Sequence, residues 1–402
     1  MADKHSKNIE PIPEKFPGYR YPSNGGAAEF SNYYRPNWVE INHKNLENNF
    51  REMKKLLPDG VSVLAVVKAN AYGHGMIPVS RTLEGCKAKF FGVTSVEEAL
   101  ALKSARVKTP ALILGNIFPF TNLLPAIKDD VRITVASVDS AKMCDHYAKK
   151  AGKKVFAHAK IDTGMNRIGV NVRHGLEFIN KIRSFKNIKL EGMYTHFSDS
   201  ADDPGFTGKQ LKLFKELIAA LRSRNIAIPY LHCANSAAII KYPEARLSMV
   251  RPGISLYGVN PVSGAGKVRL KPVLSWKSRI VFLKDVPAGT PVSYARTFTT
   301  KKKSRIATAA FGYADGFRRS LSNKGVALVR GRRSRAVGRI TMDMTMLDVT
   351  GIPGVEVGDE VVLIGAQGGD NISVQEFGVS LDTSPYEAFC GISIRVPRIN
   401  IY

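Results

Sequence analysis

The sequence predicts an N-terminal (β/α)8 barrel, or TIM barrel, followed by a C-terminal β-rich domain. Eight short apolar runs occur between residues 63 and 250, and most are separated from the next by a segment with helical periodicity. After Gly258 this rhythm stops, and short alternating segments are punctuated by turn sequences such as PAG, GYADG and VGDE. Strands that alternate with helices form right-handed βαβ units, and eight units over about 200 residues match the size of a closed barrel.

The N-terminal part of the chain differs from the rest. Residues 1–35 are rich in Pro, Gly, Asn and Tyr without periodicity, so we expect a poorly ordered arm. Regular structure should start near Trp38, and apolar residues at helical spacing predict a first helix over residues 45–57. The eight predicted barrel strands are residues 63–67, 90–93, 111–114, 133–135, 155–161, 190–194, 230–233 and 249–250.

Local signals support individual elements and the boundary between the domains. Ser95 precedes VEEALALKSA and can cap that helix, and residues 208–222 place their apolar side chains on one helical face. The sequence NPVSGAGK breaks both patterns, so we assign residues 36–262 to the barrel and residues 263–402 to the β domain. Strands of the second domain are expected at residues 278–284, 304–310 and 361–364.

Composition indicates a globular protein. The chain has 402 residues, 44% of them hydrophobic, and it contains no apolar run of membrane-spanning length and no apolar secretory signal at its start. A cytoplasmic location is therefore expected. The four cysteines are scattered without CxxC spacing, so we expect reduced packing residues, with no disulfide and no bound metal.

The formal net charge of +25 raises the question of an anionic partner. The densest basic clusters are residues 301–303, 318–319 and 330–335. No nucleic-acid-binding module or interleaved aromatic platform accompanies them, so no nucleic-acid partner is expected, and the lack of a membrane-spanning run predicts no membrane partner. We interpret the charge as a solvated basic surface that also attracts anionic substrates or cofactors, and nucleic-acid binding stays the alternative.

The stretch VLAVVKANAYGHG at residues 63–75 is the first candidate site. Its apolar run predicts a buried parallel strand that ends at Lys68, and the small residues and glycines that follow predict a turn into a helix. The active sites of TIM barrels lie at the carboxyl ends of the strands. A partly desolvated lysine amine at this position is a candidate for forming a Schiff base with a substrate or cofactor. The alternative is a lysine stem that runs from a strand end to solvent.

Other polar residues follow later strands of the predicted barrel. His196 follows the sixth strand, Ser236 the seventh, and Arg251, Gly253 and Ile254 the eighth. Barrels commonly bind phosphate in the loops after strands seven and eight. Ser236 could instead be a helix N-cap and Gly253 a turn residue, but together with Lys68 they suggest a site for a phosphorylated aldehyde.

The loop after the fifth predicted strand carries Lys160, Asp162 and Arg167 in the sequence AKIDTGMNRIG. Charged side chains in such a loop can either form part of an active or binding site or simply be exposed to solvent.

Nine motifs in order resemble those of the alanine racemase family. They are AVVKANAYGHG, KIDTGMNRIG, EGMYTHFSDS, CANSAA, MVRPGISLYG, VSYARTF, FGYADGF, GRITMDMTMLDVT and ISIRVPR, and the match runs from about residue 35 to the C-terminus. The arm and the strong basicity have no counterpart in the family pattern.

The resemblance implies an enzyme that uses pyridoxal phosphate (PLP), acts as a homodimer and interconverts L- and D-alanine for peptidoglycan precursors. Lys68 matches the lysine that holds the cofactor and acts as one base, and Tyr294 matches the second base, which comes from the partner subunit. His196 and Arg251 match residues near the cofactor ring. The phosphate-binding positions are Tyr72, Ser236, Gly253, Ile254 and Tyr386.

Further positions follow from the same resemblance. Arg167 and the main chain at Met342 match the groups that bind the substrate carboxylate, and Tyr313 and Asp343 match residues that line the entrance. Lys160 matches a lysine that is carbamylated in many members. The three tyrosines Tyr294, Tyr313 and Tyr386 could alternatively be half-buried interface aromatics.

Two alternatives to an alanine-specific enzyme stay open from the sequence. One is a racemase of broad specificity that acts on serine, lysine or arginine, because the size of the pocket near Tyr313, Met342 and Tyr386 is not evident from the sequence. The other is a non-catalytic PLP-binding protein, which would need neither Tyr294 nor the second domain. A decarboxylase of related fold is less consistent with the motifs VSYARTF and MDMTMLDV.

Overall fold

The computed structural model describes residues 35–262, 264 and 268–402. The predicted arm, residues 1–35, lies outside the described residues except for Arg35. Over the described part of the chain, no helix is both long and apolar enough to cross a membrane.

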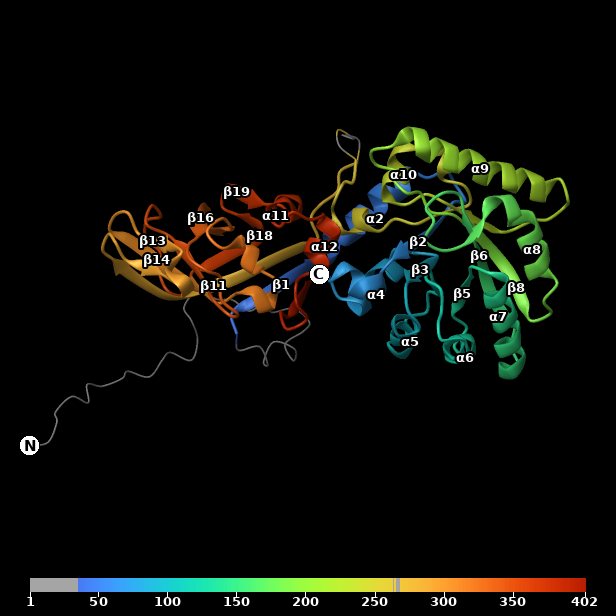
Figure 1. Cartoon of the computed structure of the whole chain (residues 1–402), viewed down its shortest axis with the longest axis horizontal. Coiled ribbons are helices and arrows are strands. Elements are labelled where there is room, and N and C mark those ends of the chain that lie inside the picture. Colours follow the sequence, from blue (N-terminus) through green and yellow to red (C-terminus); the bar gives the residue numbers. More distant parts are fainter. Residues whose placement is uncertain (1–34, 263, 265–267) are drawn as a thin grey trace, which may run out of the picture.

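The N-terminal part is a parallel barrel, as the alternating pattern predicts (Figure 1). Within residues 35–262 eight parallel strands pair in the order β10-β2-β3-β4-β5-β6-β8-β9. The ring closes between the last two strands, where Asn235 and Arg251 form a parallel bridge and Arg251 N donates to Ala234 O at 2.9 Å. The strands are β2 (Ser62–Val66), β3 (Phe90–Val93), β4 (Ala111–Ile113), β5 (Arg132–Val135), β6 (Val155–Asp162), β8 (Ile188–Tyr194), β9 (Tyr230–His232) and β10 (Met249–Val250), with the short β7 (Val170–Asn171) paired to β6.

Helices connect these strands and cover the outside of the barrel (Figure 1). Two predicted signals are confirmed: the Ser95 side chain accepts from Glu98 N, and the helix predicted at residues 208–222 buries its apolar face. The helices are α2 (His43–Lys55), α3 (Lys68–Tyr72), α4 (Met76–Gly85), α5 (Val96–Ser104), α6 (Leu123–Lys128), α7 (Val138–Ala151), α8 (Gly175–Arg183), α9 (Pro204–Arg222) and α10 (Ser236–Lys241).

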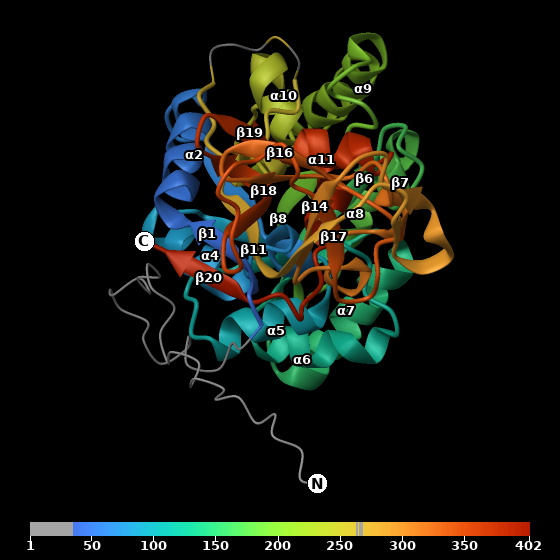
Figure 2. The same cartoon turned by 90° about the vertical axis from the view of Figure 1, so that its left-hand side faces the viewer.

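The C-terminal part is built on an antiparallel sheet, which lies in front of the barrel in Figure 2. Its central strand β11 (Leu274–Val286) pairs with β1, β14 and β18. The other elements are β12 (Pro291–Val292), β13 (Phe298–Thr299), β14 (Ser304–Ala309), β15 (Val326–Val329), β16 (Arg332–Ala336), β17 (Thr345–Asp348), β18 (Glu360–Gln367), β19 (Asp370–Ile372), β20 (Arg398–Ile401), α11 (Val374–Ser380) and α12 (Pro385–Cys390).

The expected assignment of residues 36–262 to the barrel is wrong for the first described strand. Strand β1 (Asn37–Asn42) was expected to belong to the barrel unit, but it pairs antiparallel with β11 and parallel with β20 in the second sheet. The Trp276 indole fixes this register by donating to Asn37 Oδ1 at 2.8 Å. The pairing partners lie more than 200 residues away in sequence, so the local pattern around Trp38 contains no information about them.

One apolar core runs through both parts of the chain. The same cluster of buried side chains includes Leu64 and Phe91 of the barrel and Trp276 and Phe311 of the second domain. The close packing extends to the main chain: a Cβ on Gly73 would lie 2.6 Å from Phe389 O, and Arg398 Nε donates to Gly73 O at 2.9 Å. Helix α12 is therefore held against the carboxyl ends of the barrel strands, close to α3.

Candidate active site

A cavity of about 690 Å³ lies at the carboxyl ends of the barrel strands. It collects side chains from the ends of several strands and from α12 of the second domain, which is the usual position of barrel active sites. The predicted site residues that line it are Lys68, Tyr72, Lys160, Arg167, His196, Ser236, Arg251, Gly253, Ile254 and Tyr386.

Lys68 starts a turn of unusual conformation directly after β2. Ala69, Asn70, Ala71 and Tyr72 all have left-handed backbone angles, with φ between 51° and 55°. L-residues pay about 1–2 kcal/mol each for this region, so the turn must be held by its surroundings. Glu98 Oε1 accepts from Ala69 N at 2.6 Å, and the Asn70 side chain accepts from Met76 N at 2.8 Å. The composition of the segment predicts a turn into a helix but not its handedness.

His74 supports the far side of the same turn. Its Nδ1 lies 3.0 Å from Ala71 O and 2.9 Å from Tyr72 O, so this nitrogen carries the proton and donates. The ring packs between Tyr257 and Phe389, with centroid distances of 4.5 and 4.7 Å. Burial lowers the pKa of His74 to about 3, which keeps the imidazole neutral.

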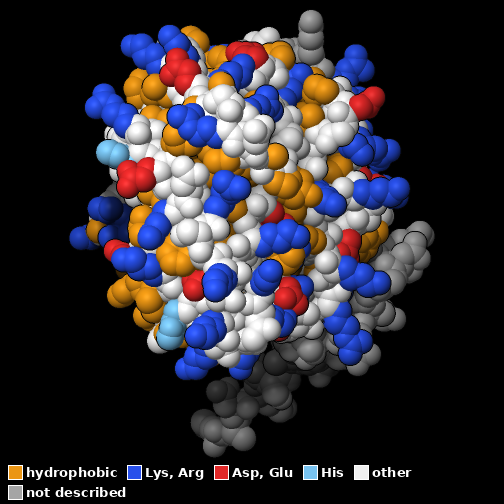
Figure 3. Space-filling model, turned by 90° about the vertical axis from the view of Figure 1, so that its right-hand side faces the viewer, with side chains coloured by type: hydrophobic (Ala, Val, Ile, Leu, Met, Phe, Trp, Pro, Cys, Tyr) orange, Lys and Arg blue, Asp and Glu red, His pale blue; other side chains and the backbone are white. Residues whose placement is uncertain are grey.

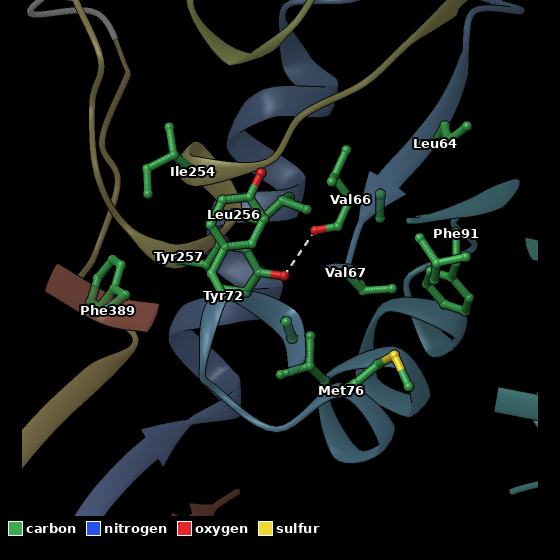
Figure 4. Close-up of a cluster of buried hydrophobic side chains, with 14 of the residues drawn as sticks. Leu64, Val66, Val67, Tyr72, Met76, Phe91, Ile254, Leu256, Tyr257 and Phe389 are labelled. Atoms are coloured by element: carbon green, nitrogen blue, oxygen red, sulfur yellow. Dashed lines mark hydrogen bonds between the residues drawn. The ribbon is translucent and has the colours of Figure 1, made fainter. Parts of the chain in front are cut away.

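Tyr257 connects this aromatic group to the strand that carries Lys68. Its hydroxyl donates to Val66 O at 2.9 Å (Figure 4), and its ring lies 4.9 Å from that of Tyr72. The backbone on both sides of Lys68 is thus fixed by buried hydrogen bonds.

Ser236 and Gly253 form a compact group of hydroxyl and main-chain amides. Ser236 Oγ accepts from Gly253 N at 2.9 Å and from Ser255 N at 3.3 Å. The helix N-cap alternative for Ser236 is wrong, because the side chain of Asn235 caps α10 by accepting from Ala238 N. A Cβ on residue 253 would lie 2.6 Å from Tyr72 Oη, so only glycine allows this close approach.

Arg251 is a buried cation, only 4% exposed, at the base of the cavity. It donates to Thr195 O at 2.8 Å and to Cys233 O at 3.2 Å. Its Nη1 lies 2.9 Å from His232 Nδ1, and its Nη2 lies 3.2 Å from His196 Nδ1. Because a guanidinium only donates, both histidine nitrogens must be acceptors.

A chain of hydrogen bonds continues from Arg251 through the barrel interior. His232 Nε2 lies 2.9 Å from His158 Nδ1, and His158 Nε2 lies 3.3 Å from Glu191 Oε1. Arg132 Nε pairs with the same carboxylate oxygen at 3.3 Å. Burial of the imidazole and repulsion by Arg251 hold the pKa of His232 well below its usual value. Neutral histidines in this chain can donate in one direction only, from Arg251 towards Glu191.

His196 and Lys160 lie in the electrostatic field of Arg251. Burial, Arg251 and Arg167 lower the pKa of His196 well below its usual value. Burial and repulsion by Arg251 lower the pKa of Lys160 to about 8. The Lys160 amine donates to Ile161 O at 3.1 Å and lies over the Tyr194 ring at 5.4 Å. At neutral pH the neutral amine is therefore a substantial minor form.

Four predicted site residues do not line this cavity in the single chain. Tyr294, Tyr313, Met342 and Asp343 all belong to the second domain, and the first three are 71%, 40% and 53% exposed. Tyr294 instead lines a separate hollow of about 490 Å³ within that domain. One copy of the chain thus brings together the Lys68 part of the predicted site and leaves the Tyr294 part at its surface.

A buried carboxylate that was not predicted from the sequence organises this exposed part. Asp315 accepts from Arg35 at 2.5 and 2.8 Å, from Arg395 Nε at 2.7 Å and from Gly312 N at 2.9 Å. Arg395 also binds Asp343 at 2.8 Å. Asp315 therefore fixes the loop that carries Met342 and Asp343.

The structure adds other residues that sequence reasoning missed. They are Glu98, His158, Glu191, His232 and Asp315. One signal was present, because His158 and Lys160 are two residues apart on a predicted strand and must face the same side. Among the described residues no group of His, Cys, Asp and Glu could hold a metal ion, and Cys86, Cys144, Cys233 and Cys390 are unpaired.

Comparison with known proteins gives matches over most of the chain. The family model "Alanine racemase, N-terminal domain" matches residues 41–261, and "Alanine racemase, C-terminal domain" matches residues 273–400. An alanine racemase of Halothermothrix orenii is 46% identical over 366 residues, which cover 90% of this chain and 96% of the relative.

Solved structures show the same similarity. Alanine racemase of Clostridium difficile has a TM-score of 0.87 and 36% identity, covering 92% of this chain and 96% of that chain. Alanine racemase of Bacillus anthracis with bound L-Ala-P has a TM-score of 0.86 and 34% identity, with the same coverage.

The environment of His74 predicts a pH-dependent difference in stability. Its folded pKa of about 3 lies below the unfolded value of about 6.5, so the unfolded state binds more protons between these values. The contribution of His74 to stability is complete above pH 6.5 and is lost as the pH falls towards 3. We expect His74→Phe to weaken this loss, measured as urea unfolding midpoints at pH 7 and pH 4.5.

The exposed His146 offers a control, His146→Phe, which should leave the pH dependence unchanged. Equal pH dependence in wild type and His74→Phe would contradict the assignment.

Proposed function

The chain belongs to the alanine racemase family, and we propose that it interconverts L- and D-alanine with PLP as cofactor and two bases from different subunits. The observation that carries the proposal is the single cavity that joins Lys68, the buried cation Arg251 and the amides around Ser236. The match to the second-domain family model disfavours a non-catalytic PLP carrier.

The residues in the cavity fit PLP. Ser236, its two amide donors and Tyr72 form an uncharged, hydrogen-bonding group of the kind that binds a phosphate. Ile254 and Tyr386 line the same part of the cavity. Arg251 is held as a cation beside the cavity and would face a ring nitrogen, and Lys68 supplies the amine for the aldehyde. His196, neutral and bound to Arg251, would lie near the ring.

When bound, PLP withdraws electrons from the Cα of an attached amino acid and so acidifies the α-proton. Arg251 is suited to a restraining role, because a guanidinium keeps its protons and does not transfer one to a ring nitrogen. Lys68 would take or return the α-proton on one side of the substrate. The hydrogen bonds of Glu98 and Tyr257 on either side of Lys68 fix the backbone from which its amine reaches into the cavity.

Tyr294 would act on the other side of the substrate from a second copy of the chain, in a homodimer. Three observations support this arrangement: Tyr294 is largely exposed, it lies in a different domain from Lys68, and its own chain does not bring it to the Lys68 cavity. Ser293 and Ala295 have φ values of 65° and 56°, so the tyrosine is held on a constrained backbone. The dimer would also bring Tyr313, Met342 and Asp343 to the entrance.

Arg167 is the proposed partner of the substrate carboxylate, together with the main chain at Met342. It is exposed at the cavity from a loop that Asp162 Oδ1 shapes by accepting from three successive amides. Carbamylation would convert the Lys160 amine into an anionic carbamate close to Arg167. Alanine is the substrate that the relatives' names support, and turnover on serine, lysine and arginine would test a broader specificity.

Variants of the two proposed bases give the first test. Lys68→Ala should abolish the absorbance of cofactor linked covalently to the lysine and all racemisation. Tyr294→Phe should keep that absorbance and lower racemisation by roughly 10²–10⁴-fold, the range for loss of a general base. In deuterated water it should still exchange the α-proton of one enantiomer, because only one base is lost. The exposed Tyr402→Phe is a control that should behave as wild type. Racemisation by Lys68→Ala would refute the proposal.

The lowered pKa of Lys160 predicts a second result. A neutral amine reacts with dissolved CO2, so we expect Lys160 to be carbamylated in bicarbonate buffer. The intact mass under native conditions should exceed the sequence mass by one CO2 after allowance for cofactor, and Lys160→Gln should lack this increase. An unmodified mass in saturating bicarbonate would contradict the prediction.

A further inference from the structure

The barrel carries a basic surface at the end opposite the cavity, and the proposed chemistry makes no use of it. Three segments that lead from a helix into the next strand form it: residues 128–132, 149–156 and 183–189, which precede β5, β6 and β8 or form their first residues. We call them the basic face. They contain two aspartates and nine basic residues, namely Lys128, Arg132, Lys149, Lys150, Lys153, Lys154, Arg183, Lys186 and Lys189.

These three segments are neighbours in space. Strand β6 pairs with β5 on one side and with β8 on the other, and Phe156 lies opposite Lys189. The Lys153 amine donates to Lys128 O at 2.6 Å and binds Asp130 at 2.9 Å. The view onto the side of α7 and α8 shows many Lys and Arg side chains and few acidic ones (Figure 3). The three segments therefore lie side by side at one end of the barrel.

Most of its charge is free to act on a partner. Within the described residues, the exposed side chains of Lys149, Lys150, Lys154, Lys186 and Lys189 take part in no ion pair. Lysines in the last turn of α7 compensate the partial negative charge of a helix carboxyl end. That role does not apply to Lys154, Lys186 and Lys189, which lie beyond the helices.

We propose that the basic face binds the surface of an anionic lipid bilayer, a partner that the lack of a membrane-spanning run in the sequence did not predict. Clusters of four to eight basic residues beside a membrane helix or on an amphipathic helix attract anionic lipids, and each Lys or Arg near the bilayer surface contributes about 1 kcal/mol. The cluster is rich in lysine, a point charge that suits a diffuse anionic surface better than bidentate recognition of a single phosphate. All three segments lie at the same end of the barrel, so their basic side chains can contact a flat bilayer surface at the same time. The cavity opens at the carboxyl ends of the strands and stays accessible.

The same face is less suited to single-stranded nucleic acid. Phe156 has Arg132 and Lys189 over its ring, at 4.9 and 5.0 Å, and Phe185 has Lys181 over its ring at 5.9 Å. Both aromatic rings are therefore already covered by cations and cannot serve as stacking platforms for bases.

Vesicle sedimentation with the full-length holoenzyme tests the proposal. We expect binding to vesicles of phosphatidylcholine with about one third phosphatidylglycerol, no binding to phosphatidylcholine alone, and release at high salt. The triple variant Lys154→Glu, Lys186→Glu, Lys189→Glu should bind the anionic vesicles at least about tenfold more weakly.

A matched control carries the same change of charge elsewhere. Lys301, Lys302 and Lys303 are exposed in the turn between β13 and β14 of the second domain, and their reversal to Glu should change vesicle binding by less than about twofold. Both triples should keep the wild-type melting temperature and alanine turnover, since neither touches the cavity. Equal loss in the two triples, no binding of wild type at low salt, or preferential binding of a DNA duplex by the basic face would overturn the proposal.

Discussion

The burial of a permanent cation in the barrel is the constraint on which the site depends. Arg251 cannot lose its proton, so its buried donors need acceptors inside the protein. Two carbonyls and two histidines accept from its Nη1 and Nη2, and the chain from His232 through His158 ends at the carboxylate of Glu191. Such a charge is costly to bury and is retained only with a complete set of partners. The same field lowers the pKa values of the neighbouring His196 and Lys160.

The site is also divided between two domains whose relative position is fixed by a shared core. Strand β1, the first described strand, lies in the second sheet, and Arg398 from the C-terminal end binds the carbonyl of Gly73 beside the Lys68 turn. This packing brings Tyr386 to the cavity but leaves Tyr294 exposed on the same domain. One chain thus brings Tyr386 but not Tyr294 to the Lys68 cavity.

Much of this could be predicted from the sequence. The eight barrel strands follow local periodicity, and Lys68, Ser236 and Arg251 meet because parallel strands end at one side of a barrel. The membership of β1 in the second sheet, the left-handed turn and the roles of Glu98 and Asp315 could not be predicted, since each depends on partners distant in sequence. Asn235 and Ser236 are adjacent and both residue types commonly cap helices, so the sequence did not show that Asn235 is the N-cap of α10.

In the proposed dimer a working site needs Lys68 of one chain and Tyr294 of another. Co-expression of Lys68→Ala and Tyr294→Phe chains with different affinity tags tests it directly. Random pairing makes half of the dimers mixed, and each mixed dimer has one site with both bases intact, so the mixture should regain about a quarter of the wild-type activity. The purified mixed dimer should have about half. If both bases came from the same chain, every site in the mixture would lack one of them, and the absence of any recovered activity would contradict the account.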